Sequence, residues 1–424
     1  MSQPPRRVGA AIVGLGGAVA TTAAAGLELL RLGTVAPDGL PLAGLTVGDV
    51  PIEEATGLVG YDDLVVGGWD LDGSDLYKAA EQHAVLDSRQ LQQVEPALSA
   101  TTPWPAAGDA DFCRNVTGGN VVLAEGRRAQ TDAVRADLRR FREEQQLDGL
   151  VLLNLASTER WPDPAAGCLQ TPEAFEAGLD ADDRAITPSM VYAYAAICEG
   201  VGYANFTPSL SADVPALVQL AEQRGVPIAG KDGKTGQTMM KTVLAPAFRS
   251  RALTVEGWYS TNILGNRDGL ALDDPASLES KLQTKAKVLD SILGYAVEDH
   301  IVRIDYYRPR GDQKEAWDAI DLVGFLGQRM QVKVDFQCRD SILAAPLALE
   351  IVRLVDLAQQ RGQGGVQRQL GWFFKAPITA DGSTPEHALH RQEAVLMDWL
   401  VQGTTGGGTT SEAHAEGGVH PAPR

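Results

Sequence analysis

Short apolar runs alternate with amphipathic stretches along most of the chain. The runs that predict strands lie at residues 8–13, 64–70, 149–159, 202–209, 227–229, 253–259, 300–307 and 331–336. Segments with helical periodicity lie at 18–32, 131–146, 188–200, 214–224, 238–248, 278–293, 340–360 and 385–401. Strands that alternate with helices in this way are typical of βαβ units and a parallel sheet. No internal repeat is evident.

The first thirty or so residues allow two interpretations. Arg6 and Arg7 precede an uncharged run over 8–27, which resembles a twin-arginine or secretory signal and nearly matches the length of a membrane span. The run nevertheless divides into a strand-like half and a helical half that ends at Arg31, with Gly33 behind it as a C-cap. A strand, a glycine turn and a helix open a dinucleotide-binding unit, and we favour this interpretation.

The glycine turn itself is a variant of the dinucleotide fingerprint. Gly14, Gly16 and Gly17 suit a tight turn and a close approach to a pyrophosphate, with Ala18 following; Val19 occupies the third glycine position, so helix and strand should pack slightly further apart. An acidic residue is expected about twenty residues later. Because 34–60 is rich in proline and glycine and looks like an insertion, Asp70 is the candidate, with a turn or N-cap role as the alternative.

Small polar residues follow the later strands. In a doubly wound sheet, the carboxyl ends of the strands form the ligand crevice. Ala156 and Ser157, and then Asn205 and Thr207, are therefore candidate cofactor contacts. Simple capping of the strand ends is the alternative.

A glycine-, lysine- and threonine-rich turn at 230–238 leads into the helix predicted at 238–248. Gly233, Gly236 and the threonines suit a turn whose backbone N–H groups point at an anion, and a helix N-terminus strengthens that reading. The spacing is not that of a Walker A loop. Taken alone, the run indicates a phosphate-type site or an ordinary solvated turn.

Lysines recur near this turn. Lys281 and Lys285 lie four residues apart on the predicted helix 278–293, so they share a face; they repel each other unless an anion or carboxylate lies between them. A solvated surface pair is the alternative. Lys375 follows a bulky apolar run, so its stem must leave packed surroundings.

Bulk properties narrow the classes further. A chain of 424 residues is too long for one core, and about two or three domains are expected. The net charge of −18 argues against nucleic acid as a partner. Four scattered cysteines without a CxxC pair indicate thiols in a reducing cytoplasm. His387 and His390 lack a third ligand, so no metal site is predicted, and the Gly/Thr-rich tail from 403 to 424 should be disordered.

Eight motifs in the same order resemble the myo-inositol-phosphate synthase (inositol-3-phosphate synthase) family, in its short archaeal and bacterial form. They are LNLASTE at 153–159, YANFTPS at 203–209, KDGKTGQT at 231–238, NILGNRDG at 262–269, SKLQTK at 280–285, GDQK at 311–314, DSILAAP at 340–346 and FKAP at 374–377. The resemblance covers nearly the whole ordered chain. Val19, Arg267 and the second strand depart from the family pattern.

The resemblance implies an isomerising cyclase that converts D-glucose 6-phosphate to 1D-myo-inositol 3-phosphate with NAD, which is regenerated in each turnover. Oxidation at C5 acidifies the C6 protons, the enolate closes on the C1 aldehyde, and the ketone is reduced again. Such chemistry needs a firmly held hydride acceptor, a phosphate grip and cations where oxyanions develop.

The resemblance also implies residue roles. Thr235, Gly236, Gln237 and Thr238 would hold the phosphate, which Lys285 and Lys314 would neutralise; Lys281 and Lys375 would move protons, and Asp232, Asn262, Asp268 and Asp340 would orient the lysines, the nicotinamide or a cation. The lysines would need a depressed pKa, which crowding of ammonium groups could provide. A divalent cation, thought to serve archaeal relatives, would have to be shared with substrate phosphate or pyrophosphate because no ligand cluster is recognisable.

The implied fold is a Rossmann-type doubly wound parallel sheet interrupted by an α+β catalytic and oligomerisation domain. Its parts would be 1–239 and 340–402 for the NAD-binding domain, 240–339 for the inserted domain, and 403–424 for the tail. A homotetramer is implied as well, and no membrane partner is expected. The alternatives are a relative closing another sugar phosphate, such as fructose 6-phosphate, a non-catalytic NAD-binding regulator, and an ordinary dehydrogenase that releases NADH.

Overall fold

A computed structural model describes residues 6–109, 111–266, 288–379, 382–402 and 419–421. Its largest element is a seven-stranded sheet in the order β13-β8-β7-β6-β1-β4-β5, in which every pairing is parallel. The strands are β1 (Val8–Val13), β4 (Leu64–Asp70), β5 (Trp104–Pro105), β6 (Gly149–Asn154), β7 (Gly202–Asn205), β8 (Pro227–Gly230) and β13 (Gly365–Val366). Because the strand order reverses at β1, the crevice beside its carboxyl end is the expected ligand position.

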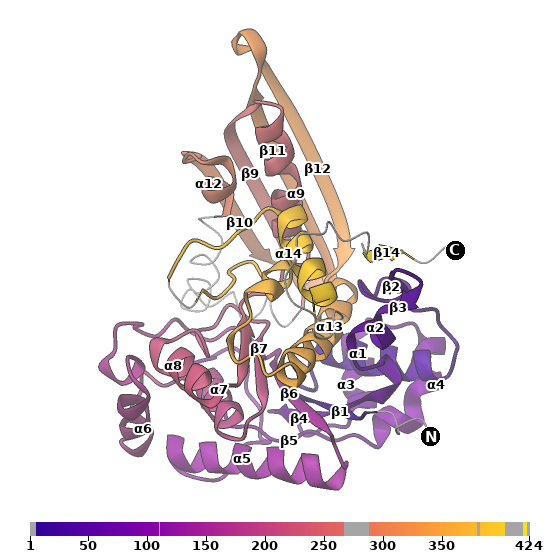
Figure 1. The fold of residues 1–424 in the computed structure, drawn as a ribbon, viewed down its shortest axis with the longest axis vertical. Coiled ribbons are helices and arrows are strands. Elements are labelled where there is room, and N and C mark those ends of the chain that lie inside the picture. Colours follow the sequence, from indigo (N-terminus) through magenta and orange to yellow (C-terminus); the bar gives the residue numbers. More distant parts are fainter. Residues whose placement is uncertain (1–5, 110, 267–287, 380–381, 403–418, 422–424) are drawn as a thin grey trace, which may run out of the picture.

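Helices cover both faces of this sheet (Figure 1). One layer contains α1 (Ala18–Arg31), α3 (Leu76–His83), α4 (Ser88–Ser99) and α13 (Asp340–Gln360), and the other contains α5 (Arg127–Glu144), α6 (Pro172–Asp180), α7 (Pro188–Cys198) and α8 (Pro215–Arg224). Alternate residues of β1 serve the two cores, with Ala10 facing the first layer and Ala11 the second. The strands are apolar throughout because both of their faces are buried.

A second sheet rises away from the first (Figure 1). Its strands, in the order β10-β9-β11-β12, are β9 (Thr254–Leu264), β10 (Asp299–Tyr306), β11 (Gln313–Val323) and β12 (Arg329–Arg339). The pairing is antiparallel except between β9 and β10. Helices α9 (Gln237–Ser250) and α12 (Val288–Leu293) join its inner face in a third apolar core. The opposite face carries alternating exposed side chains on β10 and β12.

The 34–60 region forms a small layer of its own. Strands β2 (Leu45–Val47), β3 (Val50–Pro51) and β14 (Val419–Pro421) pair in one sheet beside α2 (Ile52–Thr56). A buried network ties the region to α13: Arg353 donates to Glu350 at 2.7 Å and to Glu53 at 2.9 Å. Residues 419–421 are therefore a strand, where the sequence analysis expects a disordered tail.

The remaining elements are α14 (Leu389–Gln402) and the 3-10 helices η1 (Tyr61–Asp63), η2 (Gly167–Leu169), η3 (Arg308–Arg310), η4 (Phe325–Gly327) and η5 (Arg368–Phe373). Among the described residues, no helix combines the length and apolarity that crossing a membrane would require.

The predicted elements of the first sheet are confirmed. The strand at 64–70 pairs with β1 along its whole length, and the N-terminal segment forms β1 and α1 as the favoured interpretation requires. The second sheet was predicted less well. Strand β11 was missed, and Asn262 lies inside β9 although a loop was expected there. Of the predicted helix 278–293, the described part begins at Val288. The proposed domain boundaries stay a prediction.

Candidate active site

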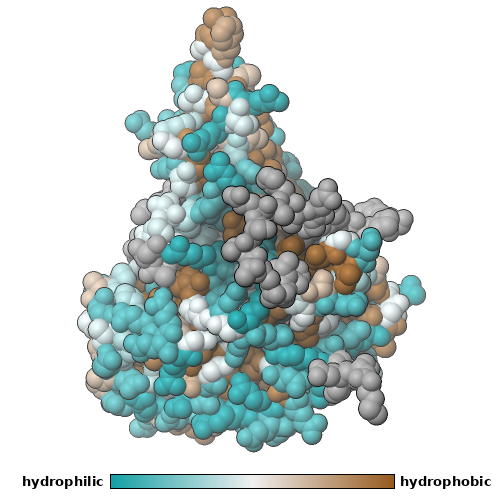
Figure 2. All heavy atoms as spheres, viewed as in Figure 1, coloured by the Kyte–Doolittle hydropathy of each residue, from teal (hydrophilic) through white to brown (hydrophobic). Residues whose placement is uncertain are grey.

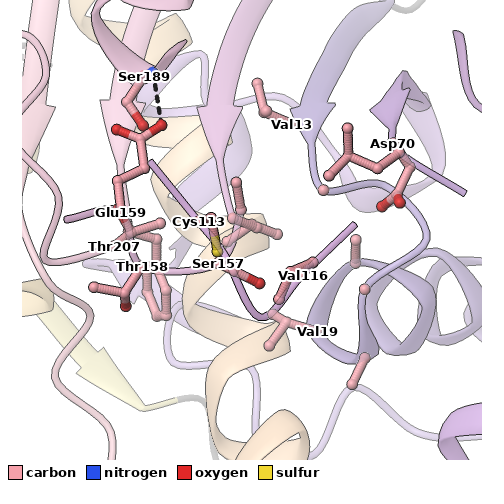
Figure 3. Close-up of a pocket in the computed structure, with 18 of the residues that line it drawn as sticks. Val13, Val19, Asp70, Cys113, Val116, Ser157, Thr158, Glu159, Ser189 and Thr207 are labelled. Atoms are coloured by element: carbon pink, nitrogen blue, oxygen red, sulfur yellow. Dashed lines mark hydrogen bonds between the residues drawn. The ribbon is translucent and has the colours of Figure 1, made fainter. Parts of the chain in front are cut away.

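A cavity of about 350 Å³ lies at the carboxyl edge of the first sheet. The glycine turn after β1, the end of β4, the segments after β6 and β7 and a loop over 106–121 form its walls. Figure 3 shows Asp70 and Glu159 on opposite sides of this pocket, with Ser157 and Val19 between them. The position agrees with the crevice expected where the strand order reverses.

The glycine turn is built so that a ligand can approach the backbone closely. Gly14 has φ +85°, and a Cβ on it would lie 3.1 Å from the backbone of Ala156. A Cβ on Gly17 would lie 3.0 Å from the carbonyl oxygen of Gly14. Helix α1 begins directly after Gly17 without a side-chain cap, and Ala18 and Val19 line the pocket. A helix N-terminus left open in this way suits a pyrophosphate.

Asp70 lies beside this turn, at the end of β4. Its Oδ2 accepts a hydrogen bond from the backbone N–H of Gly16 at 2.8 Å, and its Oδ1 accepts one from Asp72 at 3.0 Å. On the other side, Nε2 of His83 lies 2.8 Å from the carbonyl oxygen of Gly16. Both Asp70 and His83 line the pocket, so the Gly16 peptide is held between two side chains of its wall. Sequence reasoning found Asp70 and missed His83, which belongs to no motif.

The polar residues after β6 and β7 divide into two groups. Ala156, Ser157 and Thr207 line the pocket. Asn205 does not: its side chain is fully buried and donates to the carbonyl oxygen of Ser209 at 2.8 Å, while accepting from Thr207. In this structure Asn205 supports the loop internally, because a strand-end amide can satisfy backbone groups as readily as a ligand, and its role as a cofactor contact stays a prediction.

Glu159 is a pocket residue to which sequence reasoning assigned no role. Its Oε1 accepts the backbone N–H of Ser189, in the first turn of α7, at 3.0 Å (Figure 3). Burial raises the pKa of Glu159 to about 7, against the opposing hydrogen bonds from Ser189 and Thr187. Its position within the LNLASTE motif was the available signal.

Two distant segments meet after β8. Residues 230–234 pair with residues 373–378 through backbone hydrogen bonds, including one from the N–H of Lys375 to the carbonyl oxygen of Asp232 at 2.7 Å. The Lys375 Nζ lies 2.8 Å from Oδ1 of the same Asp232. Both side chains are buried, and both line the pocket. The main chain thus positions an ammonium–carboxylate pair directly.

A second such pair joins the second sheet to helix α13. Nζ of Lys314, at the start of β11, lies 3.3 Å from Oδ1 of Asp340, which begins α13. Thr235 contacts the same oxygen at 3.5 Å. Asp312 caps the first turn of α13 by accepting the backbone N–H of Ser341 at 3.3 Å, and it also accepts the Ser341 hydroxyl at 2.6 Å. The GDQK motif therefore supplies both a helix cap and a site lysine, and sequence reasoning recognised only the lysine.

A smaller pocket opens beside these pairs. It is lined by Gly236, Gln237, Thr238, Asn262, Leu264, Ile304, Lys314 and Lys375. Lys314 and Lys375 therefore border both pockets. Gly236 precedes α9 as its N-cap residue and offers no side-chain cap, and a Cβ on it would lie 3.8 Å from Nζ of Lys314. An open helix N-terminus next to an ammonium group is an anion site of the phosphate type.

The two lysines of the KDGKTGQT motif are used differently from Lys314 and Lys375. Lys231 pairs with Asp213 at 2.7 Å, and Lys234 donates to the side chain of Gln392 on α14. Burial lowers the pKa of Lys234 to about 7. Neither lysine lines the described pockets, so both hold the turn in place and do not match the charge of a bound anion.

Some predicted residues cannot be placed. Lys281, Lys285, Asp268 and Arg267 lie outside the described residues. Within the part of the chain that is described, no three His, Cys, Asp or Glu side chains gather as a metal site would require. His387 is buried beside Lys234, and its pKa is lowered to about 4 by burial and by that neighbouring charge.

Comparisons with known proteins agree on one family. The profile of the NAD-binding family described as myo-inositol-1-phosphate synthase matches residues 8–401. The chain is 41% identical to inositol-3-phosphate synthase 1 of Bacteroides thetaiotaomicron over 93% of this chain and 95% of that protein. It is 32% identical to the inositol-3-phosphate synthase of Saccharomyces cerevisiae over 82% of this chain and 72% of that protein.

Solved structures agree as well. The inositol-3-phosphate synthase of Caenorhabditis elegans superposes with a TM-score of 0.88 at 26% identity, covering 95% of this chain and 86% of that one. A myo-inositol-1-phosphate synthase-related protein of Thermotoga maritima gives a TM-score of 0.76 at 26% identity, covering 93% and 98%. The chain belongs to the myo-inositol-1-phosphate synthase family.

Proposed function

We propose that this protein is an inositol-3-phosphate synthase, an NAD-dependent isomerising cyclase that converts D-glucose 6-phosphate to 1D-myo-inositol 3-phosphate. The observation that carries the proposal is the position of Lys314 and Lys375, which border the dinucleotide-type pocket and the small anion pocket together. A sugar phosphate held in the small pocket would have its reacting carbons beside both lysines and next to a nicotinamide. Family membership supports the same activity.

The larger pocket fits NAD. Gly14, Gly17 and the open end of α1 leave room for a pyrophosphate against the backbone, and Asp70 lies where a ribose hydroxyl would be bound. Ser157 and Thr207 line the same pocket. When bound, NAD would accept a hydride from the substrate and return it later in the same turnover.

Side chains and backbone groups of the protein would bind the phosphate, stabilise oxyanions and transfer protons. The N-terminus of α9 with Thr235 and Thr238 would hold the phosphate. Lys314 and Lys375 would stabilise oxyanions at O5 and O1 and exchange protons with them. Each is paired with a carboxylate, Asp340 and Asp232, which fixes the position of its ammonium group. Lys281 and Lys285 stay proposed members of this site on the strength of the family resemblance.

Two further elements belong to the proposal. A divalent cation, if one takes part, would be shared between a carboxylate such as Asp340 and the phosphates of substrate or cofactor, since the described residues hold no cluster of three ligands. We also propose a cytoplasmic protein. No disulfide joins its four cysteines, all of which lie in the described part of the chain, and reduced thiols suit that compartment.

The first prediction concerns the reaction itself. Purified protein incubated with glucose 6-phosphate and NAD should form inositol 3-phosphate, identified by NMR, without net accumulation of NADH, because the hydride returns within each turnover. Steady release of NADH would indicate an ordinary dehydrogenase. Turnover of fructose 6-phosphate to another ring would indicate a related carbocyclase, and turnover of neither substrate would favour a regulatory NAD-binding protein.

The second prediction concerns the paired lysines. Lys375→Gln and Lys314→Gln should each lower kcat by about 10³-fold, since a neutral amide cannot exchange protons with a developing oxyanion. Glutamine can still bond the neighbouring carboxylate, whereas Lys375→Ala would also remove the ammonium partner of the buried Asp232. NAD affinity, measured by calorimetry, should stay within twofold. Lys333→Gln, on exposed β12, is the matched control, and near-normal kcat in either site variant contradicts that lysine's role.

The third prediction concerns cofactor choice. The Asp70 carboxylate would bind ribose hydroxyls and repel the 2′-phosphate of NADP. Asp70→Ser should weaken NAD binding by about tenfold and reduce the preference for NAD over NADP by at least as much, as loss of one charged hydrogen-bond acceptor predicts. Titration of both cofactors against this variant and against exposed Asp38→Ser measures it. An unchanged preference would place the ribose elsewhere.

The fourth prediction concerns assembly. On the outer face of the second sheet, the rings of Tyr259 and Trp317 stack at 5.5 Å, Ile301 is 44% exposed, and the hairpin tip exposes Phe325 by 88%. That tip is the apolar patch at the top of Figure 2. Apolar surface of this extent is usually covered by a partner. We propose a homotetramer, whose mass light scattering should give; Trp317→Glu should produce smaller species, and a monomeric wild type at micromolar concentration rules the tetramer out.

A further inference from the structure

Asp318 lies in the middle of β11, and its side chain faces α9, whose first residue Gln237 bonds it. It is 2% exposed, although an isolated buried carboxylate is costly. A single oxygen, Oδ1, accepts hydrogen bonds from Nε1 of Trp258 at 2.7 Å, Oγ of Ser260 at 2.5 Å and Nε2 of Gln237 at 3.2 Å. A carboxylate with three donors is a strong local constraint on each of them.

The third donor, Gln237, connects Asp318 to the small pocket. Gln237 is the first residue of α9 and lines the small pocket. Its amide nitrogen also donates to the carbonyl oxygen of Thr261 at 3.4 Å, so both of its hydrogens are used. Its Oε1 accepts from Nδ2 of Asn262. The side chain of Gln237 therefore has no donor left for a phosphate, which only its backbone N–H could bind.

The constraint passes on to Asn262. An ionised carboxylate only accepts hydrogen bonds, so Gln237 must turn its nitrogen to Asp318 and its oxygen to Asn262. Asn262 in turn must commit its nitrogen to Gln237. The oxygen of the Asn262 amide, together with the second hydrogen of its nitrogen, is then left for the pocket that Asn262 lines. An acceptor suits a sugar hydroxyl and not a phosphate oxygen.

We propose that Asp318 is a positioning residue for substrate recognition: through Gln237 it orients Asn262 to accept a hydrogen bond from a hydroxyl group of the sugar phosphate, while the phosphate is bound by the backbone at the start of α9. The inference rests on the proposed function. Nearby Lys241, whose Nζ lies 2.8 Å from Nε2 of His300, supplies the opposite charge within the same core. Burial lowers the pKa of Lys241 to about 8, and Asp318 opposes that shift by favouring its charged form.

The test separates hydroxyl recognition from phosphate recognition. Asp318→Asn removes the charge that dictates the orientation of Gln237 and keeps the side-chain volume. The KM for glucose 6-phosphate should rise about tenfold or more, a loss of about one hydrogen bond. The inhibition constant of inorganic phosphate, and the affinity for NAD, should stay within twofold. Asp321→Asn, an exposed change on the same strand, is the matched control and should alter none of these constants.

Each outcome either supports or overturns the role of Asp318. An unchanged KM overturns the inference, and so does a parallel rise in KM and in the phosphate constant, because general loosening of the site would move both. If Asp318→Asn does not fold, Ser260→Ala removes one donor from the same oxygen and should raise KM about threefold with the phosphate constant unchanged; no rise overturns the inference. A wild type without synthase activity defeats the proposed function instead, and the same assay reveals it.

Discussion

Two ammonium–carboxylate pairs determine how this protein is put together at its centre. Lys375 and Asp232 join segments that are far apart in the chain, and Lys314 and Asp340 join the start of β11 to the start of α13 across the end of the β11–β12 hairpin. One pair closes the edge of the parallel sheet, and the other links the second sheet to α13. Lys375 and Asp232 are buried, and a buried charge is stable only when partnered, so this pair requires both of its segments to be correctly placed. The same ion pairs therefore serve both the fold and the arrangement of the site.

Local positive groups explain how an acidic protein can hold anionic ligands. With a net charge of −18, the chain as a whole repels phosphates. Attraction must come from local sources, namely the open N-termini of α1 and α9 and the ammonium groups beside them. These sources act over short distances and only from defined directions. Binding then depends on positions, and not on the charge of the molecule as a whole.

Buried polar residues around the site act on the residues that would touch ligands. Asp312 caps the helix that carries Asp340, Asn205 supports the loop that carries Thr207, and Asp318 restrains Gln237. Lys231 and Lys234 hold the turn at 230–238 in place through Asp213 and Gln392. Each of these groups is expensive to bury, and each is satisfied by hydrogen bonds to a neighbour of the pockets. The cost is consistent with a site whose geometry has to be held within fractions of an ångström.

Local patterns in the sequence determined the first sheet and its ligand edge. Apolar runs such as 8–13 and 64–70 are typical of buried strands, and Gly14 needs a backbone conformation that few other residues adopt, so these elements follow from short-range rules. Tertiary structure alone decided the second sheet and the partners within the site. Strand β11 was not predicted because Asp318 interrupts the apolar alternation of its buried face. No local rule reveals that this carboxylate is stabilised by hydrogen bonds from β9 and α9. Likewise, Lys231 and Lys234 belong to the glycine-rich motif but do not line the two pockets. Lys314 and Lys375 come from distant segments and line both pockets. The direction of each side chain is set by packing and hydrogen bonding across the whole fold.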